Sequence, residues 1–306
     1  MDKKNLINIA GITITLLAFA FLLKTFLSFD VNYSALLSSK YAFFILIATG
    51  FSALSVFFAA CCWQKLMFYF SGKKINFKIV FNFYAKATLG KYLPGNVGHY
   101  LSRQVFGASL GLKQTHLAIV SILEILYNAG AAFILSAILM RNKIFELVAK
   151  ISTVLDISMF VTTVLFICFS SLVFLFFVFR KNRYFIELIS LAKNSGFWLL
   201  LLELFLFASV CLLILGLMLA LVIGISVPVG VDNIMVIITS SIISWLIGFV
   251  TPGSPGGIGV RETVLVFMLS PLFSKEVILI SVVLQRIAMV CGDVLAWIVS
   301  IAIQKE

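Results

Sequence analysis

The stretch TPGSPGGIGVRE, from Thr251 to Glu262, combines a broken backbone with two charged side chains. It holds two prolines and four glycines, and the eighteen residues before it, Asn233 to Val250, carry no charge. A helix that restarts near Gly259 presents unpaired N–H groups and the positive end of its dipole, which suits an anion. Arg261 adds a planar fork of donors that fits phosphate or carboxylate. We therefore predict an anionic headgroup site at Gly256, Gly257, Gly259, Arg261 and Glu262.

A second stretch, GKYLPGNVGHYLSR from Gly90 to Arg103, has the same pattern. Like GFVTPGSPGGIGVR from Gly248 to Arg261, it reads Gly-x-x-x-Pro-Gly with an arginine nine residues after the proline, at an offset of 158. We predict that Pro94, Gly95 and Arg103 form a weaker version of the headgroup site. The alternative for both arginines is that they snorkel to the cytoplasmic interface, with the neighbouring glutamate paired locally.

Four more charged residues, Glu124, Glu203, Arg286 and Asp293, fall inside long apolar runs. An ionised side chain at such a depth costs about 2.5 kcal/mol or more unless it has a partner or water. Glu124 and Arg286 occupy equivalent places after the two broken stretches, so we expect them to meet. Either they form a structural ion pair, or Glu124, Arg286 and Asp293 line a polar path in which the two acids carry protons.

The sequence offers no catalytic residue, metal site or cofactor site. Its five cysteines all lie within apolar stretches and none has metal-ligand spacing, while His99 and His116 are seventeen residues apart without thiol or carboxylate companions. The Gly-x-x-x-x-Gly-Lys-Ser/Thr motif of nucleotide binding is absent. Energy for any transport would therefore come from a gradient or from mass action.

The composition predicts an integral membrane protein. Of the 306 residues, 62% are hydrophobic and 11% charged, and the mean hydropathy is +1.16, whereas about a quarter of the residues of a soluble domain are charged. The net charge of +11 comes from short loops rather than one basic face, which argues against nucleic acid and for anionic lipid headgroups.

A membrane-spanning helix needs roughly 20 apolar residues, and seven runs qualify. We therefore predict an all-α, polytopic helical membrane protein. The seven expected spans are Leu6 to Leu23, Tyr41 to Trp63, Leu117 to Met140, Ile157 to Phe179, Phe197 to Ile225, Asn233 to Val250 and Val277 to Ile303.

The two broken stretches, Ile79 to Leu110 and Thr251 to Pro271, fit no full span. Hydrocarbon offers no partner for freed backbone groups, so these elements must be buried in protein or line a wet cavity. We predict one domain over residues 1–306 with an internal repeat. The copies would cover about 6–140 and 197–303, joined by a span at 157–179. The alternative is two unrelated kinks.

Charge asymmetry predicts the orientation. With a cytoplasmic N-terminus and both broken stretches returning to their own side, sixteen Lys and Arg residues face the cytoplasm and five face outward. We therefore expect a multi-pass protein of the cytoplasmic (inner) membrane. The side of the C-terminus depends on the broken stretches being re-entrant.

The segments YLPGNVGHYLSR, SILEIL and PGGIGVRE resemble the flippase-like membrane domain of lysylphosphatidylglycerol synthases, and the resemblance covers essentially the whole chain. Its most specific part is Pro255 to Glu262. The resemblance implies a protein that moves a lipid or a lipid-linked headgroup between leaflets, in some relatives alongside cell-envelope polysaccharide or polyprenyl-phosphate pathways. Many relatives carry an acid where this chain has His99. The synthases continue into a soluble catalytic domain after the membrane domain, so we do not expect the present chain to make lysyl-lipid itself.

We therefore expect a flippase-like transporter whose partner is an anionic phospholipid or polyprenyl-phosphate lipid. One alternative is a membrane-embedded glycosyl or lipid transferase, although the outer loops offer only scattered single carboxylates. Another is a scaffold that binds an envelope-biosynthesis enzyme. The sequence leaves the lipid, the direction of movement, the coupling and the oligomeric state open.

Overall fold

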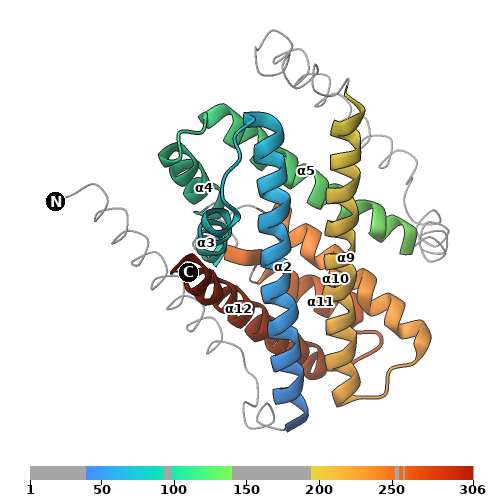
Figure 1. The fold of residues 1–306 in the computed structure, drawn as a ribbon. Coiled ribbons are helices and arrows are strands. Elements are labelled where there is room, and N and C mark those ends of the chain that lie inside the picture. Colours follow the sequence, from blue (N-terminus) through green and yellow to red (C-terminus); the bar gives the residue numbers. More distant parts are fainter. Residues whose placement is uncertain (1–38, 93–97, 140–193, 252–254, 258, 306) are drawn as a thin grey trace.

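The computed structural model describes residues 39–92, 98–139, 194–251, 255–257 and 259–305, and every regular element in these ranges is a helix (Figure 1). Five of the helices are long and apolar enough to cross a membrane. Their outward faces carry exposed apolar side chains such as Leu46, Phe133 and Leu199, which suit contact with lipid. The chain is therefore a multi-pass helical membrane protein.

Helices α2 (Ser39–Ser71) and α9 (Ser195–Ser226) are the two longest apolar helices. Neither has a distinct polar face, as expected of helices surrounded by protein and lipid. The side chain of Asn194 caps α9 by accepting from the Gly196 N–H at 2.9 Å. In Figure 1 α2 runs from bottom to top and α9 from top to bottom, so the two helices are antiparallel.

The first broken stretch folds as three short elements between α2 and α5 (Gln114–Leu139). They are α3 (Phe77–Thr88), the 3-10 turn η2 (Leu89–Tyr92) and α4 (Gly98–Ser109). Asn76 starts α3 by accepting from the Lys78 N–H at 2.9 Å. Gly90 lets η2 approach the first residue of α4 closely, because a Cβ there would lie 3.0 Å from the backbone at Gly98.

The second broken stretch follows α10 (Val231–Val250) and precedes α12 (Lys275–Lys305). It contains the turn η3 (Pro255–Gly257) and the helix α11 (Val260–Leu269). Gly256, Gly257 and Gly259 have φ values of +56°, +75° and +85°. Only glycine adopts this left-handed region readily, so these residues permit the sharp reversal between α10 and α11.

Helix α12 crosses α2 at very short range. A Cβ added at Gly292 would lie 2.3 Å from the Ser52 Cβ and 2.8 Å from the Thr49 carbonyl oxygen. The Ser52 hydroxyl donates to the Met289 carbonyl at 3.2 Å across the same crossing. Small residues at such a crossing let two membrane helices pack backbone to backbone.

Five of the seven predicted spans are confirmed as long helices, with ends within a few residues of the prediction. The exception is the end of α2, which continues past Trp63 to Ser71. Both predicted broken stretches are interrupted by a 3-10 turn. The predicted spans at 6–23 and 157–179 lie outside the described residues.

Candidate functional site

A cavity of about 230 Å³ lies where the first broken stretch meets α2, α5, α9, α10 and α12, and we name it the polar cavity because charged side chains lie in its wall. Lys91, His99, Arg103, Glu124 and Asp293 are its titratable or charged members apart from tyrosines and one cysteine. Three of the residues predicted from the sequence, Arg103, Glu124 and Asp293, are therefore brought together. They come from α4, α5 and α12, so the cavity depends on the packing of distant segments.

Glu124 accepts from two groups in the wall of this cavity. The Arg103 Nη1 lies 2.5 Å from Glu124 Oε2, and the Tyr84 hydroxyl donates to Glu124 Oε1 at 2.8 Å. The guanidinium carbon of Arg103 also lies 3.9 Å from the centre of the Tyr84 ring. Arg103 is 2% exposed, and its Nε has no partner among the described residues. Arg103 is thus fixed in place while one donor stays unused.

Asp293, which also lines the cavity, has the same kind of environment. Its Oδ2 lies 2.6 Å from the Lys91 Nζ and accepts from the Tyr92 hydroxyl at 2.5 Å. The Asp293 side chain is 2% exposed and that of Lys91 is 26% exposed. This ion pair therefore joins a buried acid to a base that reaches the surface of the protein.

His99 also lines the cavity, near the two cations Lys91 and Arg103. Burial, followed by the charges of Arg103 and Lys91, holds the pKa of His99 well below its ordinary value. The ring is therefore neutral at neutral pH, and its centre lies 3.8 Å from that of Tyr100. Its Nδ1 is buried without a hydrogen-bond partner in the described part of the chain. A neutral imidazole here adds a hydrogen-bonding group without adding charge.

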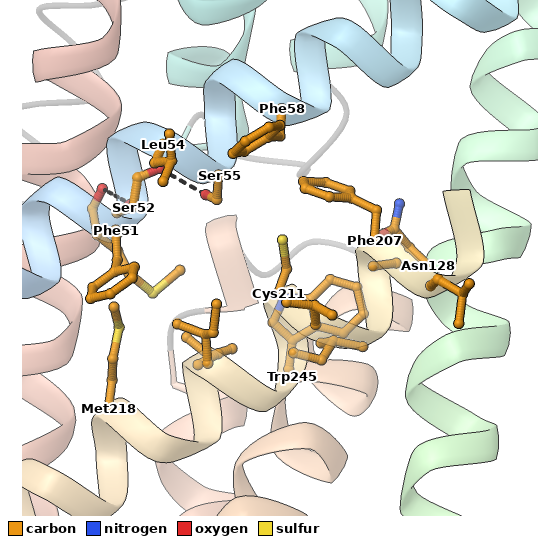
Figure 2. A pocket seen from close by; sticks show the side chains of 17 residues that line it. Phe51, Ser52, Leu54, Ser55, Phe58, Asn128, Phe207, Cys211, Met218 and Trp245 are labelled. Atoms are coloured by element: carbon orange, nitrogen blue, oxygen red, sulfur yellow. Dashed lines mark hydrogen bonds between the residues drawn. The ribbon is translucent and has the colours of Figure 1, made fainter. Parts of the chain in front are cut away.

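An apolar groove of about 500 Å³ adjoins the polar cavity. In Figure 2 side chains of α2, such as Phe51 and Phe58, lie along one wall, and those of α9, such as Phe207 and Met218, lie along the other. Groove and cavity share eight lining residues, which are Ser52, Ser55, Asn128, Phe207, Ala208, Cys211, Trp245 and Met289. The two spaces are therefore neighbours, one polar and one apolar.

The second broken stretch is closed by contacts within the chain. Arg286 donates to the carbonyl oxygens of Gly256 and Gly257 at 2.9 and 3.1 Å, and its Nη2 lies 2.9 Å from Glu262 Oε1. The other oxygen of Glu262 accepts from the Gly259 N–H at 2.6 Å. The Glu262 side chain therefore caps α11 itself, where we expected from the sequence a free N–H group for an anion.

Arg261 takes part in no ion pair among the described residues. Its side chain runs through a space left by two glycines, since a Cβ at Gly248 or Gly257 would lie 2.6 Å from it. The guanidinium carbon lies 5.8 Å from the centre of the Trp245 ring. Arg261 is therefore packed next to a residue that lines both the groove and the cavity, without lining either space itself.

The expected meeting of Glu124 with Arg286 is wrong. Each residue pairs instead with the short helix that precedes its own helix, because α4 packs on α5 and α11 packs on α12. Glu203 pairs with Lys65 of α2, a partner that the sequence alone did not indicate. Pro94 and Gly95 lie outside the described residues, and the headgroup roles of the other predicted residues stay predictions.

Sequence reasoning missed the two tyrosines that donate to the buried acids, Tyr84 and Tyr92, as well as the cation Lys91. The only available signal was that all three fall within one broken stretch, whose polar groups must find hydrogen-bond partners inside the protein.

No protein-family model matches the chain, and no curated protein matches it. The resemblance to the flippase-like domain of lysylphosphatidylglycerol synthases therefore stays a prediction.

Proposed function

We propose that this protein carries an anionic amphipathic lipid, such as a phospholipid or a polyprenyl phosphate, between the leaflets of the cytoplasmic membrane. The polar cavity takes the headgroup and the apolar groove takes part of the acyl or prenyl chain. This function is the one implied by the resemblance to the flippase-like domain of lysylphosphatidylglycerol synthases. The N-terminus lies in the cytoplasm in this proposal.

The observation that carries the proposal is the contact between a polar and an apolar space within one group of helices. A lipid headgroup needs hydrogen-bond donors away from hydrocarbon, and its chain needs an apolar wall. Arg103 and His99 each keep a buried nitrogen without a partner in the described residues, and both line the polar cavity. Residues such as Asn128 and Trp245 lie on both spaces, so one ligand can occupy them together.

An inverted repeat is the second part of the proposal. The helices follow the same order twice, as α2, α3, η2, α4, α5 and as α9, α10, η3, α11, α12. Helix contacts also come in corresponding pairs: α2 packs on α12 as α9 packs on α5, and α3 packs on α12 as α10 packs on α5. In Figure 1 α5 runs towards the right and α12 towards the left, which matches the antiparallel α2 and α9. The copies would then begin at α2 and α9, later than the sequence predicted for the first copy.

An inverted repeat makes the two broken stretches open to opposite sides of the membrane, with η2 and η3 in contact between them. The first would face the cytoplasm and the second the outer side, and the C-terminus would be cytoplasmic. Compared with the orientation expected from the sequence, only Arg261, Lys275 and Lys305 change sides. The positive-inside bias is preserved.

The test is leaflet exchange in liposomes that contain the purified full chain and a trace of fluorescent phosphatidylglycerol. Dithionite bleaches only the label in the outer leaflet, so exchange is measured as the additional label that becomes bleachable. We expect the wild-type chain to exceed protein-free liposomes by at least about tenfold. We expect Asn128→Leu, which makes the boundary of the two spaces apolar, to abolish the excess while the protein remains monodisperse.

Extraction and chromatography of the lipid separate transport from chemistry. Unchanged labelled lipid with fast exchange supports a carrier, whereas a new lipid product would favour the transferase alternative. Wild-type exchange no faster than in protein-free liposomes, for both phosphatidylglycerol and a polyprenyl phosphate, would refute the carrier. Co-purification of an envelope enzyme in a fixed ratio would then favour the scaffold.

A further inference from the structure

The charges of the polar cavity are balanced, which is unexpected for a site that takes an anion. Lys91 is neutralised by Asp293 at 2.6 Å, and Arg103 by Glu124 at 2.5 Å, while His99 is neutral. An entering phosphate group therefore meets no net positive charge. Burying an anion without a compensating positive charge costs free energy. Binding therefore requires that Asp293 or Glu124 is protonated, or that one of them gives up its cation to the phosphate.

The two ion pairs differ in how readily they can separate. Arg103 is held by Glu124 and lies over the rings of Tyr84 and Tyr100, at 3.9 and 5.7 Å from their centres. Lys91 ends in a compact ammonium group on a flexible stem, and its side chain is 26% exposed. The pair of Lys91 with Asp293 is therefore the one that can exchange partners without moving a helix.

We propose that the polar cavity binds a phosphate-bearing headgroup together with one proton, which Asp293 takes up. The inference rests on the proposed function and adds that lipid binding is coupled to the uptake of a proton. A proton from water joins the Asp293 carboxylate, Lys91 leaves the neutral acid, and its N–H groups donate to a phosphate oxygen. On release the phosphate departs, Asp293 returns its proton to water, and Lys91 pairs with it again. Lipid and proton thus enter and leave as an electrically neutral pair.

The groups that surround Asp293 across the cavity fit this assignment. Elements α2 and α10 contribute no charged side chain to the cavity lining, and Glu124 is already bound by a fixed cation and a tyrosine. The titratable or charged groups near Asp293 or in the cavity wall are Tyr84, Lys91, Tyr92, His99, Tyr100, Arg103, Glu124, Tyr127 and Cys211, with Arg286 of its own helix and Arg261 of α11 beyond the wall, close enough for their charges to act on Tyr92.

The experiment measures the dissociation constant of fluorescent phosphatidylglycerol for the full chain in neutral detergent, from pH 5.5 to 8.5 at constant ionic strength. For the wild type we expect affinity to fall as the pH rises, by up to about tenfold per pH unit, as one linked proton requires. Asp293→Asn leaves Lys91 free at every pH, so it should bind tightly without pH dependence. Lys91→Met should bind weakly throughout.

Glu203→Gln is the matched control, because it removes a carboxylate of another ion pair that lies on the outside of α9, away from both spaces. It should keep the wild-type pH dependence. A wild-type affinity that does not change with pH would overturn the proton coupling, and so would an unchanged slope in Asp293→Asn. Absence of binding at every pH would instead refute the proposed function.

Proton uptake gives an independent readout that needs no variant. Lipid added to wild-type protein in weak buffer with a pH indicator should remove about one proton per lipid bound from solution. If no proton is removed from solution, the inference is wrong, whether or not the variants fold.

Discussion

In both broken stretches a charged residue on the short helix pairs with one on the following long helix, but the positions of the acid and the base are exchanged. In the first, a base on the short helix α4, Arg103, pairs with an acid on the long helix α5, Glu124. In the second, an acid on the short helix α11, Glu262, pairs with a base on the long helix α12, Arg286. The first pair lines a polar cavity, and the second is packed against a turn.

The difference follows from the hydrogen-bonding capacity of the residue on the long helix. Arginine has five donors, so Arg286 still has donors for the carbonyl oxygens of Gly256 and Gly257 after it has paired with Glu262. A carboxylate only accepts, so Glu124 cannot bind the carbonyl groups of a turn. Arg286 therefore fixes the second broken stretch to α12, whereas the first broken stretch lies beside the polar cavity.

The largest effect is expected from Arg286→Met. The substitution leaves Glu262 as a buried charge without its cation and frees two backbone carbonyl groups, at a cost of about 3–5 kcal/mol. Thermal unfolding in detergent, followed by circular dichroism, measures the loss. Arg103→Met should cost less, because it releases one carboxylate and no backbone group. A smaller loss for Arg286→Met than for Arg103→Met would contradict the comparison.

Gly292→Ala should have the next largest effect on stability. Its Cβ would overlap Ser52 and the Thr49 carbonyl at the crossing of α12 and α2, which typically costs about 1–3 kcal/mol. At Gly130, a glycine inside the long helix α5, an added methyl group would have no neighbouring atom within 4 Å, so Gly130→Ala is the matched control. The same unfolding measurement should show it unchanged or stabilised by up to about 1 kcal/mol. Equal effects of the two substitutions would show that the crossing is not tight.

Arg261→Ala should change stability by less, because Arg261 has an aromatic neighbour but no ion pair among the described residues. We expect a loss of about 0.5–1 kcal/mol from the contact with Trp245. The sequence predicts that this variant loses leaflet exchange, because Arg261 would hold the headgroup, whereas a headgroup held in the polar cavity, which Arg261 does not line, predicts that exchange continues. Normal exchange by this folded variant would assign binding to the first broken stretch alone.

The smallest effect is expected from Glu203→Gln, because both members of its ion pair with Lys65 are more than half exposed. Exposed pairs contribute about 0–1 kcal/mol. Unfolding and exchange should both stay close to the wild-type values. A loss comparable to that of Arg103→Met would show that this pair also holds helices together.

The apolar runs predicted the described long helices well, because hydrocarbon thickness sets their length. The run that ended at Trp63 failed to predict the last turns of α2, since Gln64 and Lys65 continue the helix with polar side chains. Counting apolar residues does not detect a helix that extends beyond the hydrocarbon. The glycines and prolines correctly marked where the backbone is interrupted.

The partners of the buried charges were harder to predict. The sequence pairs Glu124 with Arg286 because they follow the two broken stretches at similar places, but such a similarity does not imply contact. The correct partner, Arg103, lies twenty-one residues earlier on another helix, and only the packing of α4 on α5 brings it close. The cavity itself depends on the spacing of several helices, which no local pattern records.

The indole of Trp245 lies where the polar cavity and the apolar groove meet. Its emission colour depends on the polarity around it, so the protein carries an intrinsic optical reporter at this boundary. In a variant with Trp63, Trp198 and Trp297 replaced by phenylalanine, the fluorescence of Trp245 would report the binding of an unlabelled ligand.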